Sequence, residues 1–361
     1  MTKRWMAFAA GLLAFALAGC AQPPVTATTD VTEPDDSAAG SYKACLITDA
    51  GSASDGSPAQ QAISGLDRAQ RELGIETNSV TADSAADYPR VLQSLVDAQC
   101  SIVVALGSGM ADSVEAAAKT NTDVQFALVD ATPNTAPPNL RPVLFSTHES
   151  SFLAGYLAAA RSASGKVGVF GALSVPAVTI YMDGFVQGVD YYNQAKGAQV
   201  QALGWDLAAQ DGTFVRSDAA PYQDPAAGRV AAESLTAQGA DLIMAVAGDS
   251  GTGALQLAAD TGTLKVIWTD TNGCLTEAVA CDQQLGSVVK DRGSAVYELI
   301  RADKDGRNAS GVFTAALRND GTALVEARDG DFGADLTAEL DRIAKDIIDG
   351  SISVTSPSAI G

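Results

Sequence analysis

Short apolar runs alternate with amphipathic stretches of helical period along most of this chain, and this alternation limits the folds it can adopt. Six apolar runs have the length of single buried strands: 44–48, 102–106, 125–129, 166–170, 242–246 and 265–268. Six stretches between them have the period of helices: 60–73, 88–98, 110–119, 179–195, 225–238 and 253–260. Buried strands that alternate with helices predict an α/β fold with parallel, doubly wound sheets.

The composition argues against several classes of function. The 361 residues carry a formal net charge of −20, and 47% of them are apolar. So acidic a chain lacks the clustered lysine and arginine that bind nucleic-acid phosphates. Its apolar content and length predict a well-buried globular fold with room for two lobes. No C-x-x-C spacing occurs and there is one histidine, which disfavours zinc. We expect no nucleic-acid partner, no metal and no cofactor.

The first twenty residues have the pattern of a secretory signal peptide. A lysine and an arginine precede an apolar run over residues 5–16, which is too short for a stable membrane anchor. The run ends in small residues followed by Cys20, which resembles the lipobox of bacterial lipoproteins. We expect residues 1–19 to be removed and Cys20 to carry the lipid; an ordinary signal with an incidental cysteine is the alternative. Residues 20–40 lack lysine, arginine and aromatic residues, which predicts a disordered stalk outside the cytoplasmic membrane.

Four further cysteines permit two disulfides in an extracytoplasmic chain. Cys274 and Cys281 lie close together in a loop that contains glycine and asparagine, so we expect a local bridge. Cys45 and Cys100 lie at the starts of two predicted strands and become neighbours if those strands pair. Four reduced, buried cysteines are the alternative, above all for the distant pair.

Polar residues follow the predicted strands on both halves of the chain. Carboxylates come within two residues of three strand ends, as Asp49, Asp130 and Asp270. Glycine-rich turns follow two other strands, at 107–109 and 248–253. Ligands of doubly wound sheets bind beyond the carboxyl ends of the strands, and glycine lets backbone N–H groups approach a ligand closely. Each feature alone is more typical of a helix cap or a tight turn, but their repetition on both halves predicts a binding site.

Signals for an enzyme are weak. No G-x-S-x-G nucleophile elbow occurs, and residues 248–253 do not match the G-x-G-x-x-G of dinucleotide-binding folds. His148, the single histidine, lies where the chain is expected to cross between lobes. We interpret it as a hinge or surface residue rather than a general base. An extracytoplasmic hydrolase or phosphatase is the enzyme alternative.

The loops and strands, taken in order, resemble the basic membrane protein family of lipoproteins, the purine-nucleoside-binding components of bacterial ABC importers. The resemblance runs from about Tyr42 to about Arg318. It depends on seven segments taken together: 46–51, 149–157, 166–171, 184–188, 238–243, 247–253 and 287–290.

This resemblance implies a type I periplasmic-binding-protein fold, in which two doubly wound lobes are joined by a multi-strand hinge. On that basis we place the first lobe at 41–147 plus 288–310 and the second at 148–287 plus 311–361. In the family a nucleoside lies between the lobes, where acids hold the ribose hydroxyls, aromatic rings sandwich the base and a lysine assists.

The resemblance also implies particular site residues. Asp49 and Asp130 match the acids of the first lobe, Asp270 matches that of the second, and Lys290 matches the lysine. The adjoining loops add Ser57 and Gly248 to the expected ligand contacts.

One departure from the family concerns the base. Family members commonly read Ser-Phe-Asn-Gln in the first loop, where the phenylalanine stacks on the base, whereas this chain has Pro58 and Ala59 at the second and third positions. Losing one stacking face removes about 1 kcal/mol or more. The candidate substitutes are Trp268, which we include among the expected ligand contacts, and Tyr222, Phe214 and Tyr181.

The expected function is that of a lipid-anchored extracytoplasmic receptor. It would capture a nucleoside, by family default a purine nucleoside, close by hinge motion and deliver the ligand to an ABC permease as a monomer. An extracytoplasmic sensor for a sugar-like or other small ligand is the alternative, because a permease-docking surface and a signalling surface look alike in sequence. A nucleoside-processing enzyme, such as a nucleoside hydrolase or phosphatase, is the less favoured alternative.

Overall fold

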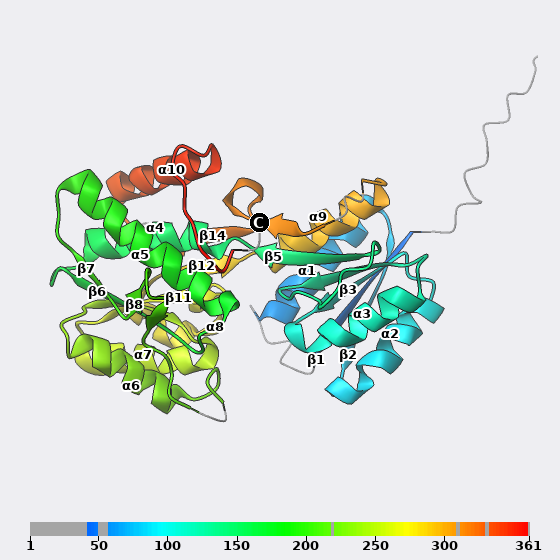
Figure 1. Cartoon of the computed structure of the whole chain (residues 1–361), viewed down its shortest axis with the longest axis horizontal. Coiled ribbons are helices and arrows are strands. Elements are labelled where there is room, and N and C mark those ends of the chain that lie inside the picture. The colour runs from blue at the N-terminus through cyan, green and yellow to red at the C-terminus, as the bar shows by residue number, and fades with distance from the viewer. Residues whose placement is uncertain (1–41, 50–56, 218–219, 308–310, 329–331, 360–361) are drawn as a thin grey trace, which may run out of the picture. The chain divides into compact units, whose positions relative to one another are not determined.

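The computed structural model describes five stretches of the chain, namely residues 42–49, 57–217, 220–307, 311–328 and 332–359 (Figure 1). The predicted signal peptide at 1–19 and the predicted stalk at 20–40 with Cys20 lie outside them. The two large sheets both belong to one unit of the fold, Ser41–Gly361.

Six parallel strands form the first sheet. In spatial order they are β13 (Phe313–Ala315), β5 (Leu140–Phe145), β4 (Gln125–Val129), β3 (Ile102–Leu106), β1 (Lys43–Asp49) and β2 (Glu76–Ala82). Every residue of β3 is buried, as expected of a strand covered on both faces. The order reverses between β1 and β3, which is the switch point where doubly wound sheets leave a crevice for ligands.

The second sheet repeats this topology. In spatial order its strands are β14 (Thr322–Glu326), β12 (Gln284–Lys290), β11 (Lys265–Asp270), β10 (Leu242–Val246), β6 (Lys166–Gly171) and β7 (Gln201–Leu203). All neighbours are parallel except β14, which runs antiparallel to β12 at the edge. A short ribbon of β8 (Trp205–Asp206) and β9 (Asp211–Gly212) lies outside both sheets.

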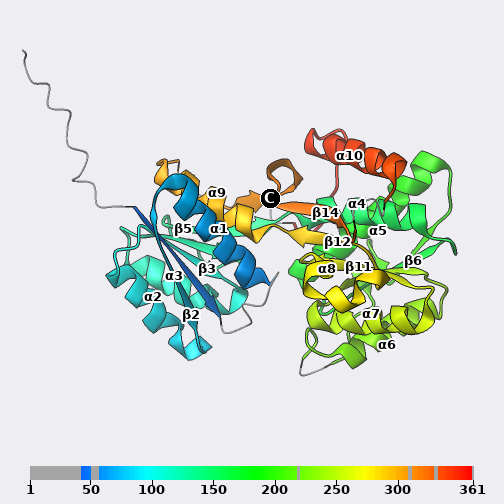
Figure 2. The same cartoon turned by 180° about the vertical axis from the view of Figure 1, so that it is seen from behind.

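Helices cover both faces of the first sheet. The helices α2 (Tyr88–Asp97) and α3 (Ala111–Thr120) lie on the face seen in Figure 1, and α1 (Pro58–Leu73) and α9 (Arg292–Lys304) lie on the face seen in Figure 2. Side chains of β1 alternate between these layers: Leu46 packs with α1 and α9, and Ile47 packs with α2 and α3.

The second sheet is covered in the same way. One face packs against α4 (Thr147–Arg161), α5 (Pro176–Lys196) and α10 (Ala334–Ile348), and the other against α6 (Pro225–Thr236) and α7 (Thr252–Thr261). The predicted fold class, two doubly wound α/β lobes, is confirmed. Shorter helices complete the chain: α8 (Gly273–Thr276), η2 (Ala85–Asp87), η3 (Ser108–Met110), η4 (Gly248–Gly251), η5 (Ala278–Gln283) and η6 (Leu317–Asn319).

The chain crosses between the sheets three times within the described residues. It leaves the first sheet after β5, returns to it after β12 and leaves again after β13. Two expected lobe boundaries need correction. The return lies after Lys290 rather than at 288, because β12 stays paired with β14 as far as Lys290. The final crossing lies after Ala315 rather than at 310, because β13 pairs with β5.

Both expected cysteine pairs are bonded in the structure. Cys45 of β1 is linked to Cys100, just before β3, with their Cα atoms 6.0 Å apart. Cys274 of α8 is linked to Cys281 of η5, with their Cα atoms 4.7 Å apart. The first bridge joins neighbouring strands of one sheet, and the second closes a local loop.

Candidate ligand-binding site

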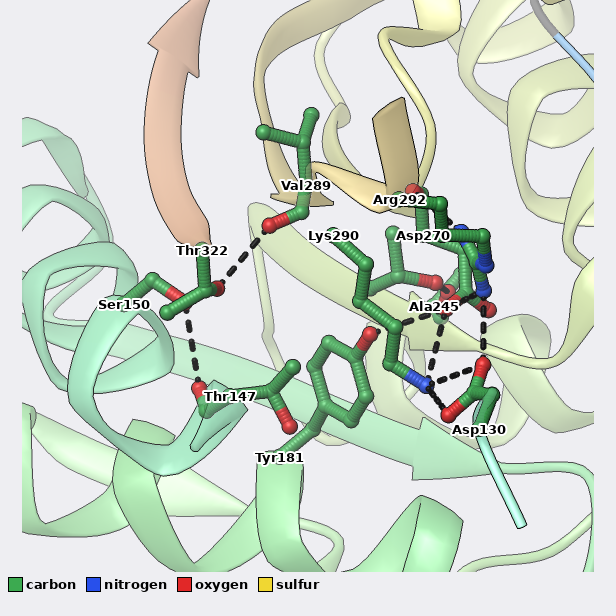
Figure 3. Close-up of polar contacts among 11 residues, drawn as sticks. Asp130, Thr147, Ser150, Tyr181, Ala245, Asp270, Val289, Lys290, Arg292 and Thr322 are labelled. Carbon is green, nitrogen blue, oxygen red and sulfur yellow. Dashed lines mark hydrogen bonds and ion pairs between the residues drawn. The ribbon is translucent and has the colours of Figure 1, made fainter. Parts of the chain in front are cut away.

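Four charged side chains meet where the chain crosses between the two sheets (Figure 3). Lys290 Nζ lies 2.9 Å from Asp130 Oδ1 and 3.3 Å from Asp270 Oδ1. Arg292 Nη2 lies 2.8 Å from Asp130 Oδ2 and 3.3 Å from Asp270 Oδ1. Asp130 follows β4 of the first sheet and Asp270 ends β11 of the second, so the two cations hold one carboxylate from each sheet. We refer to these four residues as the charged cluster.

Both acids of the cluster have a left-handed backbone conformation. The φ angle is 63° at Asp130 and 69° at Asp270. Aspartate tolerates this region better than most residues, but the conformation still costs of order 1 kcal/mol for a non-glycine residue. Each acid lies at the end of its strand, where the turn directs the carboxylate towards the two cations (Figure 3). We infer that the ion pairs hold both turns in place.

The electrostatics keep all four groups charged at neutral pH. Burial would raise the pKa of Asp130, but Lys290 and Arg292 outweigh it and hold the pKa below its ordinary value. The pKa of Asp270 is lowered by the same balance. Burial alone would lower the pKa of Lys290, yet the two carboxylates raise it. The formal charges of the cluster therefore cancel.

Two aromatic rings border the cluster. Tyr181 on α5 is buried and donates a hydrogen bond of 2.9 Å from its hydroxyl to Asp270 Oδ1. Burial, and then the charge of Asp270, raises the pKa of Tyr181, so its hydroxyl remains a donor. Lys290 Nζ lies 5.5 Å from the centroid of the Tyr181 ring and 5.7 Å from that of Phe145, which are favourable cation–π distances.

A cavity of about 380 Å³ lies beside the cluster, within the range typical of small-molecule sites. The three crossings between the sheets contribute lining residues to it, for instance Ser146, Lys290 and Thr314. A neighbouring cavity of about 160 Å³ has both acids of the cluster in its lining. Tyr222 borders both cavities and is 39% exposed.

The acids of the cluster are more accessible than the cations. The side chains of Asp130 and Asp270 are 23% and 38% exposed, whereas those of Lys290 and Arg292 are 7% and 5% exposed. A ligand in the cavities therefore meets carboxylate oxygens whose negative charge is already neutralised by the more deeply buried Lys290 and Arg292. Such oxygens accept hydrogen bonds from hydroxyl groups.

The structure brings together four of the seven expected ligand contacts. Asp130, Asp270 and Lys290 form the cluster with Arg292, and Gly248 lines the smaller cavity. The other expected contacts, Asp49, Ser57 and Trp268, line neither cavity.

Two of these three residues flank the first loop. Asp49 is the exposed last residue of β1. Ser57 is the N-cap of α1, where its Oγ accepts a hydrogen bond of 3.2 Å from the backbone N–H of Gln60. Residues 50–56, between these two, lie outside the described stretches. The cap explains why a serine stands before Pro58.

The aromatic candidates divide into two groups. Trp268 is buried in the hydrophobic core beneath α7, and its indole N–H donates a bond of 3.3 Å to Thr271 Oγ1. Trp268 was expected in the site. Alternate residues of β11 point to opposite faces of the sheet, and Trp268 points to the face covered by α6 and α7. Phe214 packs edge-on against Trp205, with ring centroids 6.1 Å apart, and also lines neither cavity. Tyr181 and Tyr222 are the candidates at the site.

Sequence reasoning missed two residues of the site, Arg292 and Phe145. Arg292 opens α9 directly after the N-cap Asp291, and Phe145 ends β5. The spacing of Lys290 and Arg292 around an aspartate was the available signal. Both cations turn towards Asp130, which lies more than 150 positions away, and towards Asp270, which lies about 20 positions away. Local sequence patterns do not show contacts over such separations.

His148 is buried rather than on the surface. It lies in the first turn of α4, just after the first crossing, and is 7% exposed. Burial lowers its pKa to about 4. No hydrogen-bond partner for its Nδ1 occurs among the described residues. Its location beside the crossing agrees with the expectation, but its burial does not agree with a surface position. A buried imidazole of this kind also differs from an exposed general base.

Two further observations concern metals and membranes. The described residues contain no group of three or more His, Cys, Asp or Glu side chains arranged to hold a metal ion. Among the same residues, no helix combines the length and apolar character needed to cross a membrane.

Comparison with known proteins gives a consistent result. The model of a family described as ABC transporter substrate-binding protein, PnrA-like, matches residues 43–357. The ABC transporter nucleoside-binding protein BmpA of Lactococcus lactis subsp. cremoris is 28% identical, over 99% of this chain and the full length of that protein. Basic membrane protein A of Borreliella burgdorferi is also 28% identical, over 70% of each chain.

Solved structures agree on the fold. An ABC transporter solute-binding protein from Aeropyrum pernix K1 superposes with a TM-score of 0.65 at 23% identity, covering 88% of this chain and 94% of that one. The family model confirms the resemblance inferred from the loops and strands, and the superposition confirms the two-lobed fold that it implies.

Proposed function

The chain belongs to the family of PnrA-like ABC transporter substrate-binding proteins, and on that premise we propose that it captures a nucleoside between its two lobes and delivers it to an ABC permease. The family is one of extracytoplasmic solute-binding proteins, and the relative that matches over 99% of the chain is described as a nucleoside-binding protein. The nucleoside, the permease and the absence of turnover are our proposals for this chain.

The observation that carries the proposal is the pair of accessible carboxylates in the charged cluster. Asp130 comes from the first sheet and Asp270 from the second, and both line the smaller cavity. The vicinal hydroxyls of a ribose are two adjacent donors, and hydrogen bonds to a carboxylate are stronger than those to neutral acceptors. Lys290 and Arg292 keep the acids ionised without occupying the exposed side of the cavity. One ligand can therefore engage both lobes through its sugar.

The base would lie in the larger cavity. Tyr222 offers a partly exposed ring there, and stacking on an aromatic face favours a planar heterocycle. Its ring supplies the stacking that Pro58 cannot provide. The Phe145 ring, in contrast, already faces the two cations, each 5.7 Å from its centroid.

Calorimetric titration tests the proposal. The chain from residue 21 onward, stripped of carried-over ligand, is titrated with adenosine, guanosine, inosine, cytidine, uridine and ribose. We expect tight binding of at least one nucleoside and much weaker binding of ribose. Failure of every nucleoside to bind would refute the proposed ligand class, and conversion of a bound nucleoside to free base would refute the assignment as a binding protein.

Variants of the acids locate the ligand. Asp130→Asn and Asp270→Asn should each raise Kd roughly ten- to hundred-fold, because a hydrogen bond to a charged group contributes about 1.5–3 kcal/mol. Asp320→Asn is the matched control, since Asp320 is also an acid in the left-handed conformation but lines neither cavity. Equal effects of all three substitutions would show that the cluster does not hold the ligand.

We further propose that Cys20 carries the lipid anchor. The leader sequence supports this, and mass spectrometry of the protein from membranes would detect the acylated cysteine. Cys20→Ala should release the protein from the membrane fraction. Unchanged membrane association of that variant would refute the anchor.

A further inference from the structure

The last described residues of the chain run back from α10 along α5 and reach the larger cavity. In Figure 1 this segment is drawn in red and leaves the end of α10. We call residues 352–359 the C-terminal strap. Along it, burial alternates: residues 352, 354, 356 and 358 are partly buried, whereas 353, 355 and 357 are exposed. Over residues 352–356 this period of two is that of an extended chain with one side on the protein. The chain then turns at 357–358, where the Ala359 N–H donates a bond of 3.1 Å to the Ser356 carbonyl.

A stripe of polar side chains on α5 holds the strap. Thr179, Asp183 and Gln187 are four residues apart and therefore share one face of the helix. Gln187 accepts a bond of 3.1 Å at Oε1 from the Thr355 N–H and donates one of 2.6 Å from Nε2 to the Thr355 carbonyl. This arrangement fixes the strap backbone as a neighbouring strand would.

The next two contacts of the stripe are side chain to side chain. Ser356 Oγ donates a bond of 2.6 Å to Asp183 Oδ2. The Ser358 and Thr179 hydroxyls lie 2.7 Å apart. Asp183 is fully buried and also accepts bonds of 2.8 Å from Trp205 Nε1 and from Gln210 Nε2. A buried carboxylate needs such donors, and the strap supplies one of them.

The end of the strap forms part of the cavity wall. Ser358 and Ala359 line the larger cavity together with Pro176 and Ile180 from the start of α5. Neither strap residue lines the smaller cavity around the two acids. If the sugar is held at the acids, the strap faces the other part of the ligand.

We propose that the C-terminal strap is a wall of the nucleoside site that contacts the base and limits its size. This inference depends on the proposed function, since it assumes a nucleoside whose ribose lies at the charged cluster. Ser358 and Ala359 are the specificity-determining residues, and the polar stripe of α5 positions them. The strap belongs to neither sheet.

A tryptophan placed in the wall tests the proposal. Ala359→Trp adds a bulky ring where the strap meets the cavity, and it should raise Kd for adenosine and guanosine at least ten-fold while affecting cytidine and uridine less. Ser353→Trp adds the same ring at an exposed position of the same strap. The control variant should bind every nucleoside as the wild type does.

A second variant removes the wall instead of filling it. Deletion of residues 356–361 should weaken binding of adenosine and guanosine at least ten-fold, mainly through faster dissociation. Circular dichroism and thermal melting establish that each variant is folded.

The possible results separate the two proposals. If the wild type binds a nucleoside and both strap variants bind it with unchanged Kd, the strap inference is overturned and the proposed function stands. If the wild type binds none of the nucleosides, the proposed function fails and the inference that depends on it fails as well.

Discussion

Acidification to pH 4 should destabilise this protein through one buried histidine. His148 is the single histidine of the chain, and burial at the start of α4 lowers its pKa from 6.5 to about 4. In the unfolded chain it has its ordinary pKa. Between these two pH values the unfolded state binds a proton that the folded state does not, so the free energy of unfolding falls as the pH falls.

The size of the effect follows from the shift. A difference of one pKa unit corresponds to about 1.4 kcal/mol, so the full loss between pH 6.5 and pH 4 is about 3 kcal/mol. Below pH 4 both states bind the proton and His148 contributes no further change. The charge of Asp183 on the facing helix α5 opposes burial and is already included in the lowered pKa.

Urea unfolding followed by tryptophan fluorescence at several pH values between 7 and 4 measures this loss. His148→Gln cannot titrate, so we expect it to unfold with a shallower pH dependence than the wild type by about 3 kcal/mol across this range. The raised pKa of Glu149, which acts in the opposite direction, is common to both proteins and cancels in the comparison.

A control variant separates the titration from a general loss of stability. Val114→Ala, in the core of the first lobe, destabilises the fold but retains His148 and should keep the pH dependence of the wild type. Equal pH dependence of His148→Gln and the wild type would refute the reasoning, because it would mean that the buried imidazole does not resist protonation.

Three other substitutions have effects that follow from contacts in the structure, each measured by urea unfolding. Gly184→Ala should cost about 1–3 kcal/mol because the added methyl group meets the His148 carbonyl where α5 packs on α4, while the exposed Gln194→Ala should cost little; equal costs would contradict this packing. Loss of the Cys45–Cys100 bridge, which spans 55 positions, should cost about 4 kcal/mol in the chain-entropy model, and an unchanged midpoint would refute that value. Lys290→Met should cost about 1–3 kcal/mol because it removes one of the two buried cations that pair with the partly exposed Asp130 and Asp270, and a neutral result would show that Arg292 alone balances them.

The predicted elements agree with the structure where burial has a simple local pattern. The expected strands at 102–106, 125–129 and 242–246 have the bounds of β3, β4 and β10, which are covered by helices on both faces. The expected helix at 60–73 lies within α1, which has a marked apolar side. In these segments the burial of each residue follows a pattern that is visible among its neighbours in the sequence.

Other elements lack such a pattern and were not singled out. β2 lies at the edge of its sheet, and its mostly polar, partly exposed residues form no apolar run. α4 is buried on nearly every side, so it has no amphipathic period. In both cases position in the tertiary structure, rather than local sequence, determines burial.

By itself the sequence determined the α/β class, the family, the cysteine pairs to consider and the acids at the strand ends, because burial period and strand-end chemistry are local properties. Only the tertiary structure decided that Arg292 joins Lys290 between Asp130 and Asp270, that Trp268 lies in the core, and that the strap residue Ser358 reaches the cavity. The first outcome depends on how the three crossings bring distant segments together, whereas the positions of Trp268 and Ser358 depend on packing within the second lobe. Side chains on different crossings meet because of the geometry of the two sheets. The spacing of residues along the chain does not contain this geometry.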